Sequence, residues 1–462
     1  MATDARYKRY FCTNPIIDTM TRTILSLLPG ILTVILAAFS CTPQDIQEPD
    51  PNPGEEEKPG VPGPPDGKQV YIPKEFKDMN LLSEDSRYCW KRSFATEDII
   101  IFWEKGFGDD LSAASPYKGH EMTVDLARLS TQAQGFYDLY KKDLNFIQAG
   151  SKADKYRMMV MLQYDDDGTA YGGSYDDVIG ALWVTPLRTH DMRLNAIAHE
   201  LGHSFQFQLS IDGNTGFGGG GVYEMTSQWM LWQTNPAWYD DEVYHWDALL
   251  DQLHLAFMHP DNMYHTAHVF EAWSNDRGQP FMADLWRAAR KKNDVVKVYE
   301  GLTGMSHEEF CDEQFQICRR LATFDFDRVR EACARYSGFR GSNGSSRSTS
   351  YGAADADGWR TVSAKEAPQQ YGFNRLKLKD GQRRVGFRSG TGGWRYGFVG
   401  IKADGSPVYS PMFSAAEGEA IFDSEETFKE IWFLVMAAPS AHQSLDESQA
   451  KSYKSYTYKL KY

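Results

Sequence analysis

The spacing of apolar residues changes along this chain of 462 residues, and that change limits its fold more than any other feature. Short apolar runs at 99–103, 158–163 and 178–185 predict buried strands, and 124–146 has the spacing of a helix. We therefore expect an α+β domain over 69–340, with its sheet in the first half. From residue 190 onward the spacing predicts helices at 190–209, 222–234, 243–258, 266–274, 280–292, 306–321 and 325–336.

The last hundred residues have a different pattern. A chain of this length exceeds what one hydrophobic core normally serves, so a second domain is expected. Residues 341–358 are small and polar and predict a linker. Short alternating runs with turn signals between them then predict an all-β sandwich over 359–462. These runs lie at 375–379, 384–388, 394–401, 419–422, 431–436 and 456–462.

The first 68 residues predict a targeting segment and a tether. An apolar run at 24–39 ends at Ser40-Cys41, which is typical of a lipoprotein signal peptide over 1–41 with the lipid on Cys41. Residues 42–68 are rich in proline, glycine and acidic residues and predict a disordered tether. An uncleaved membrane anchor is the alternative. Both interpretations place the rest outside the cytoplasm, and the first predicts a lipid-anchored protein at the outer membrane or cell surface.

Charge and cysteine content exclude some classes and leave others open. The formal net charge of -14 argues against a nucleic-acid-binding protein, because affinity for phosphates comes from clustered lysine and arginine. The even number of cysteines after residue 41 permits two disulfides outside the cytoplasm, and their spacing leaves the pairing open. These cysteines are Cys89, Cys311, Cys318 and Cys333.

The segment from His199 to His203 reads His-Glu-Leu-Gly-His and fits the HExxH pattern of zinc sites. On a helix, residues four apart share one face, so both imidazoles can bind one Zn²⁺ while Glu200 acts on a water molecule. We expect Thr189 to cap this helix and Asp191 to lie in its first turn. An apolar stripe is expected to pack inward. It consists of Leu194, Ala198, Leu201 and Phe205.

A catalytic zinc site usually needs a third protein ligand. The metzincin pattern would need glycine and histidine where this chain has Gln206 and Leu209, so that clan is excluded. The gluzincin pattern needs a glutamate on the next helix, and Glu224 lies at about that distance, after the glycines at 218–221 that would let the chain reverse. A simpler interpretation of Glu224 is a favourable charge at a helix N-terminus. Weaker third-ligand candidates are Asp212, Asp240 and His245.

Four segments of the chain resemble segments of a known protein family. HELGHSFQFQ, YEMTSQWMLWQ, NMYHTAHVFEAWSN and IWFLVMAAPSAH are similar to a Bacteroidetes lipoprotein family of HExxH, gluzincin-like zinc metallopeptidases. The similarity covers most of the chain after the tether. It implies a zincin-like catalytic domain followed by a β-sandwich, and it implies no particular substrate.

These patterns together predict a secreted, monomeric zinc metallopeptidase that acts on proteins, peptides or glycoproteins. Glu200 would be the general base, and an oxyanion donor would come from Tyr264 or His265, of which we favour His265. The strand at 178–185 would bind extended substrate as a sheet edge. Two alternatives stay open: a noncatalytic surface adhesin or glycan-binding lipoprotein, and a metal-dependent hydrolase of another bond.

Overall fold

The computed structural model describes most of the chain after residue 62. The described residues are 63–218, 220–291, 293–334, 339, 347–390, 392–444 and 453–462. The predicted signal peptide over 1–41 and lipid attachment at Cys41 lie outside them, as do most of the predicted tether and part of the predicted linker. Within the described ranges, no helix is both long enough and apolar enough to cross a membrane.

The first half of the described chain contains a mixed five-stranded sheet in the order β1-β2-β3-β5-β4. The three central strands are parallel, and β1 and β4 pair antiparallel at the edges. The predicted central strands are confirmed; their continuous apolar sequences suit strands covered on both faces. The strands are β1 (Ser93–Ala95), β2 (Ile99–Trp103), β3 (Met158–Leu162), β4 (Ala170–Tyr175) and β5 (Ile179–Val184).

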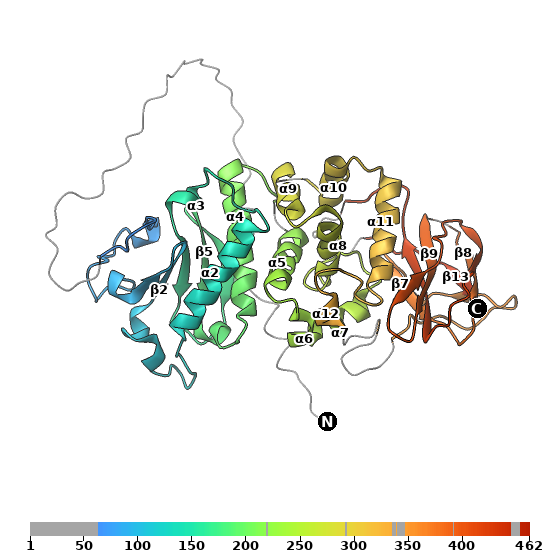
Figure 1. The fold of residues 1–462 in the computed structure, drawn as a ribbon, viewed down its shortest axis with the longest axis horizontal. Helices are drawn as coiled ribbons and strands as arrows, with labels where there is room; N and C mark the ends of the chain where they lie inside the picture. Colours follow the sequence, from blue (N-terminus) through green and yellow to red (C-terminus); the bar gives the residue numbers. More distant parts are fainter. Residues whose placement is uncertain are drawn as a thin grey trace, which may run out of the picture. The chain divides into compact units, whose positions relative to one another are not determined.

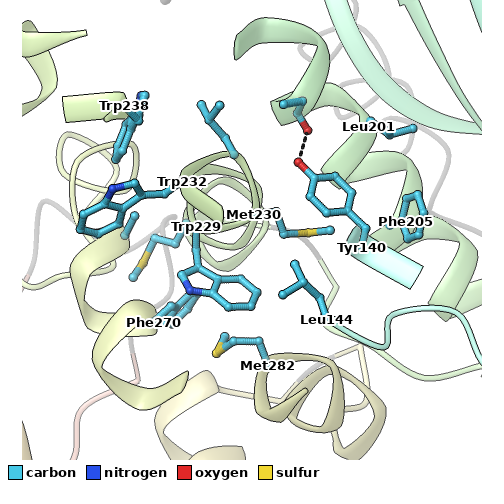
Figure 2. Close-up of a cluster of buried hydrophobic side chains, with 14 of the residues drawn as sticks. Tyr140, Leu144, Leu201, Phe205, Trp229, Met230, Trp232, Trp238, Phe270 and Met282 are labelled. Atoms are coloured by element: carbon cyan, nitrogen blue, oxygen red, sulfur yellow. Dashed lines mark hydrogen bonds between the residues drawn. The ribbon is translucent and has the colours of Figure 1, made fainter. Parts of the chain in front are cut away.

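Two long helices, α2 (Leu126–Lys142) and α4 (Asn195–Gly213), pack against this sheet and against each other (Figure 1). Their contact is aromatic: the ring of Phe205 lies 5.0 Å from that of Tyr137 and 5.4 Å from that of Tyr140. The hydroxyl of Tyr140 also donates to a backbone carbonyl of α4 at 2.9 Å (Figure 2). This contact fixes the position of α4 across the sheet.

The second half is helical, as the spacing predicted. At its centre is α5, whose Trp229 and Met230 are buried among the side chains of Leu144, Phe270 and Met282 (Figure 2). The predicted helix at 243–258 ends early, at Gln252, and α10 was not predicted. The helices of this half are α5 (Gly221–Thr234), α6 (Trp238–Asp241), α7 (Val243–Gln252), α8 (Ala267–Arg277), α9 (Phe281–Ala288), α10 (Val295–Thr303), α11 (His307–Arg320) and α12 (Arg330–Cys333); the short α3 (Lys152–Lys155) belongs to the first half.

The C-terminal region contains two four-stranded antiparallel sheets, β10-β9-β12-β7 and β11-β8-β13-β6. A second apolar cluster between them includes Phe387 from one sheet stacked 4.2 Å from Tyr396 of the other. The strands are β6 (Arg360–Thr361), β7 (Phe373–Lys377), β8 (Arg384–Arg388), β9 (Trp394–Ile401), β10 (Pro407–Tyr409), β11 (Glu417–Ile421), β12 (Glu430–Ala437) and β13 (Lys459–Lys461).

The sheet that contains β9 and β12 is buried on both faces, because its other face joins the large apolar core of the helical half. Backbone contacts also join the two regions: the amide of Phe373 donates to the carbonyl of Leu253 at 2.7 Å, and Arg375 donates to the carbonyl of Leu250 at 3.0 Å. The first bond uses the carbonyl directly after α7, which is consistent with the early end of this helix. Residues 63–462 form one compact α+β unit, and the domain boundaries stay a prediction.

All four cysteines of the described chain are buried free thiols, so the two disulfides that the cysteine count permits are not formed. In α11, Cys311 and Cys318 are on one helix and pack into the core. Burial raises the pKa of Cys311 to about 12, which keeps its thiol protonated and unreactive near neutral pH. These residues therefore contribute apolar packing rather than chemistry.

Candidate metal centre

The helix that contains the HExxH segment is capped differently from the prediction. It begins at Asn195 rather than near 190, and Leu194 just before it has the left-handed conformation, with φ of 52°. The carboxylate of Asp191 accepts a hydrogen bond from the Asn195 amide at 2.8 Å. Thr189 lies in a preceding 3-10 turn, where its hydroxyl donates to the carbonyl of Pro186, so its predicted role as N-cap is wrong.

The predicted apolar stripe of this helix is confirmed. All of its members are buried, with at most 1% of each residue exposed. The stripe faces α2 and the sheet, and on a neighbouring face His199 and His203 both reach Glu224 of α5. The stripe consists of Leu194, Ala198, Leu201 and Phe205.

Three side chains converge at this face. Nε2 of His199 and Nε2 of His203 are 3.1 Å apart, and Oε2 of Glu224 lies 3.2 Å from the first and 3.3 Å from the second. Among the described residues, these three form the group of histidine, cysteine and carboxylate side chains whose geometry suits a metal ion. The weaker candidates Asp212, Asp240 and His245 are not members of this group.

Close packing between α4 and α5 brings Glu224 within reach. A methyl group on Gly202 would lie only 2.8 Å from Oγ of Ser227 and 3.3 Å from its Cα, so this glycine allows the two helices to approach. At the start of α5, Gly220 has φ of 84°, a conformation that glycine adopts without strain and that turns the chain back toward α4. The predicted reversal before Glu224 is therefore seen at Gly220.

Two glutamines orient the histidine rings. Nδ1 of His199 lies 2.6 Å from Oε1 of Gln228, and Nδ1 of His203 lies 3.1 Å from Oε1 of Gln206. The amide nitrogen of Gln206 donates to the carbonyl of Tyr223, and that of Gln228 donates to the carbonyl of Tyr264, so both side-chain oxygens face the rings. Each neutral ring thus has its proton on Nδ1 and a lone pair on Nε2.

This donor set fits a zinc ion. Two nitrogen lone pairs and a carboxylate oxygen face one another at 3.1 to 3.3 Å, which is repulsive unless a cation lies between them. Ligands of a four-coordinate zinc with bonds of about 2.0–2.1 Å are roughly 3.3 Å apart, close to the separations seen. Two imidazoles and one carboxylate are a usual set for catalytic zinc, which keeps a fourth position for water.

In the metal-free site the charges of His203 and Glu224 balance each other. Burial alone would lower the pKa of His203, but the Glu224 carboxylate outweighs it and raises that pKa to about 9. Burial alone would raise the pKa of Glu224, yet the two histidines hold it well below its usual range. Without metal, the site therefore retains a proton on His203 near neutral pH.

Metal affinity should depend on pH as a result. Zinc must displace the His203 proton below a pH of about 9, so we expect its apparent affinity to rise about tenfold per pH unit between pH 7 and 9. The metal-free fold should behave in the opposite way. The pKa of His203 is higher in the metal-free fold than the value of 6.5 in the unfolded chain, so protonation of His203 stabilises this fold fully below pH 6.5. The stabilisation is lost as the pH rises toward 9. Zinc titration calorimetry at several pH values measures the slope, and a flat profile would contradict this protonation state.

Glu200 lies beside the three donors but is not one of them. It follows His199 on α4 and is half-buried, and its charge contributes to the raised pKa of His203. A carboxylate at this place can exchange protons with a water molecule held near the donors. Its role as general base stays a prediction.

The edge of the sheet beside the site is β4, not the strand predicted from sequence. The predicted strand, β5, pairs with both β3 and β4 and is interior. In β4, Gly172 packs so closely on α4 that a methyl group there would overlap the carbonyl oxygen of Glu200. The exposed backbone edge next to the donors therefore belongs to β4.

Replacing Gly172 with alanine should displace the metal-bearing helix. We expect a loss of about 1–3 kcal/mol in unfolding free energy and weaker zinc binding, because the added methyl meets helix backbone that cannot rotate away. Gly173→Ala is the matched control: its methyl would lie on the other face, at an ordinary 3.6 Å from the Trp183 ring. Thermal melting and zinc titration compare the two variants; equal effects would show that β4 does not fix α4.

The two candidates for the oxyanion donor lie in the segment before α8. The ring of Tyr264 is 6.2 Å from that of His199, centre to centre. His265 is half-buried, and its Nδ1 is 2.7 Å from Nδ1 of His245. Tyr264 is thus the candidate that directly neighbours a metal-site ring.

Sequence reasoning missed Gln206, Gln228 and β4. Both glutamines had a signal in helical spacing, since Gln206 is three residues after His203 and Gln228 is four residues after Glu224. Strand β4 had none, because its sequence AYGGSY contains two adjacent glycines, which usually indicate a turn.

Fold and site together define a class: an α+β protein with a His-His-Glu group that could hold a metal ion. The chain belongs to DUF6055, described as a family of unknown function, whose model matches residues 63–462. Comparison with curated proteins gives no match, and neither does comparison with solved structures.

Proposed function

We propose that this protein is a zinc-dependent metallopeptidase. The observation that carries the proposal is the convergence of His199, His203 and Glu224 at 3.1 to 3.3 Å, with Glu200 beside them and both rings oriented by glutamine carbonyls. A structural zinc site would have four protein ligands, whereas a site with three leaves one position for water. The donor set therefore favours catalysis over a purely structural ion.

The chemistry divides between the ion and the chain. A zinc ion held by His199, His203 and Glu224 would supply Lewis acidity, which would acidify water and polarise a carbonyl group. Glu200 accepts a proton from the attacking water and returns it to the leaving amine. We assign the donor to the oxygen that becomes negative in the transition state to the hydroxyl of Tyr264, because its ring lies 6.2 Å from that of His199.

The architecture supports a zincin-like assignment with a β-sandwich after it. A mixed sheet with an antiparallel edge strand next to the HExxH helix, followed by a helical half with the third ligand, suits a gluzincin. The backbone edge of β4 can add an extended peptide as a further strand. We therefore propose a protein, peptide or glycoprotein substrate bound along β4.

The proposed setting follows from the N-terminal residues. A monomer anchored through a lipid on Cys41 and a tether over 42–68 would present the site outside the cell. The negative net charge of -14 is in keeping with a partner other than nucleic acid.

Zinc loading and peptide cleavage together test the proposal. Residues 63–462 should bind one zinc per chain and cleave members of a mixed peptide library, and a chelator should stop cleavage until zinc is restored. Zinc binding without cleavage of any peptide would favour the noncatalytic surface adhesin. Cleavage of a non-peptide amide alone would indicate a metal-dependent hydrolase of another bond.

A further inference from the structure

Two stacked aromatic rings lie on the sheet beside the metal centre. The ring of Tyr171 on β4 is 4.8 Å from that of Trp183, its partner across the ladder on β5, and the two planes differ by 11°. At this separation the rings overlap face to face, because two rings side by side in one plane would lie farther apart. Both residues are half-buried, so part of the pair meets solvent. These two residues are here called the Tyr171 stack.

The Tyr171 stack and the HExxH helix lie on opposite faces of β4. A methyl group on Gly172 would meet Cβ of His203 at 2.7 Å, so the Gly172 side of the strand faces α4. Side chains alternate between the two faces of a strand, so Tyr171 is directed to the other face. In agreement, a methyl group on Gly173 would lie 3.6 Å from the ring of Trp183. The stack is therefore one residue along the strand from the contact with a candidate metal ligand.

The free edge of β4 consists of the backbone groups that do not face β5. The amide of Thr185 donates to the carbonyl of Thr169 at 3.0 Å. In an antiparallel ladder, residues paired in this way alternate with residues whose N–H and C=O groups point away from the partner strand. With the register of β4 and β5, the outward residues are Ala170, Gly172 and Ser174. A peptide added along this edge would exchange hydrogen bonds with Gly172.

The stack can be extended toward this edge. Trp183 covers the face of the Tyr171 ring that is directed toward β5, so the opposite face is directed toward the free edge. The ring spacing of 4.8 Å also matches the distance between neighbouring strands, about 4.7–4.9 Å. A flat side chain opposite Tyr171 on an added strand would therefore continue the stack at the same spacing.

Hydrogen bonds hold the inner ring of the stack in place. The indole N–H of Trp183 donates to the hydroxyl of Tyr175 at 3.1 Å, and that hydroxyl donates to Oε2 of Glu75 at 2.8 Å. The ring of Tyr175 also packs edge-on against Trp183, with 4.8 Å between the ring centres. Because the Trp183 ring is already fixed, little conformational entropy is lost when a further ring joins the stack.

We infer that the Tyr171 stack is a specificity subsite for an aromatic side chain of the peptide that pairs with β4. This inference rests on the proposed function and adds a substrate class to it: peptides with phenylalanine, tyrosine or tryptophan next to the residue that pairs with Gly172. The side chain of that neighbouring residue lies on the Tyr171 face, whereas the residue opposite Gly172 directs its side chain to the α4 face. The preference therefore applies at one fixed distance from the cleaved bond.

Cleavage products give the first test. Peptides cut from a mixed library should have aromatic residues enriched at one position relative to the cleaved bond. Cleavage without this enrichment would overturn the inference and leave the peptidase proposal intact.

Binding gives a second test that needs no hydrolysis. Zinc-loaded Glu200→Gln protein, residues 63–462, is titrated with a short fluorescent peptide of alanine and serine that contains one phenylalanine. Replacing this phenylalanine with leucine should weaken binding about 3- to 10-fold, as expected for one pair of stacked rings. Equal binding of the two peptides, or binding of neither, would overturn the inference, as would tighter binding of a neutral oligosaccharide. The expected preference in a wild-type protein that cleaves no peptide would contradict the peptidase proposal alone.

Variants of Tyr171 then test its ring. Tyr171→Leu keeps an apolar side chain without a flat ring and should lose the preference for phenylalanine, whereas Tyr171→Phe should retain it. Phe94→Leu is the matched control, since Phe94 is an exposed aromatic residue of β1 at the opposite edge of the same sheet. If Tyr171→Leu and Phe94→Leu show the same preference at equal melting temperature, the stack has only a structural role.

Discussion

Glu200→Gln should abolish peptide hydrolysis while leaving one zinc bound per chain. Glutamine has nearly the same shape as glutamate but cannot take a proton from water at neutral pH, and loss of a general base costs about 10²- to 10⁴-fold in rate. Zinc should remain because Glu200 is not among the three converging donors. Peptide turnover and metal content by atomic absorption measure the two effects on one preparation.

The control for Glu200→Gln should remove the same charge far from the site. Glu419→Gln does so: Glu419 is an exposed residue of β11 that pairs with Arg384. We expect this variant to keep both wild-type turnover and zinc. If Glu200→Gln also kept wild-type turnover, another residue would be the base. If Glu200→Gln instead lost zinc, its carboxylate would have to be a ligand, and the assignment of donors would be wrong.

The metal-binding histidines could be predicted because their arrangement is local. The geometry of a helix alone puts His199 and His203 on one face, whatever surrounds it. The apolar stripe then decides which face is buried. To predict Glu224 as a ligand, the sequence also had to indicate that a second helix returns toward the first. The glycines before Glu224 indicated this reversal. Fold class followed from the same periodicity, because buried strands and amphipathic helices have different spacings.

The parts that could not be predicted depend on contacts between distant segments. Gly172 looks like a turn residue in the sequence, but it is glycine because α4 passes directly over it. Thr189 is a good capping residue by type, yet the helix begins after a left-handed Leu194, and the carboxylate of Asp191 accepts the hydrogen bond of the Asn195 amide. Residues 253–258 have helical spacing, but the backbone at Leu253 pairs with Phe373 instead. In each case, contacts between segments distant in the sequence outweigh the local preference of the residues.

Replacing Glu224 with alanine is expected to weaken zinc binding by more than about 100-fold. Changes to residues that only orient metal ligands typically cost 10- to 100-fold, and a ligand should cost more. Gln206→Leu and Gln228→Leu supply that reference, because both glutamines contact the rings and not the metal position. Isothermal titration of the metal-free variants with zinc should therefore give a graded series, with Glu224→Ala the weakest.

Stability gives a second readout of the same loss. Zinc at 100 times its dissociation constant should stabilise the wild-type fold by about 2.7 kcal/mol, and the Glu224→Ala protein should show almost none of this at the same zinc concentration. Asp212→Asn is the matched control, since Asp212 was also a candidate ligand but instead accepts hydrogen bonds from Ser151, Lys152 and Gln208. It should keep the full zinc-induced shift in melting temperature. Normal zinc stabilisation of Glu224→Ala, with loss in Asp212→Asn, would move the third ligand to the end of α4 and remove the basis for a catalytic site between α4 and α5.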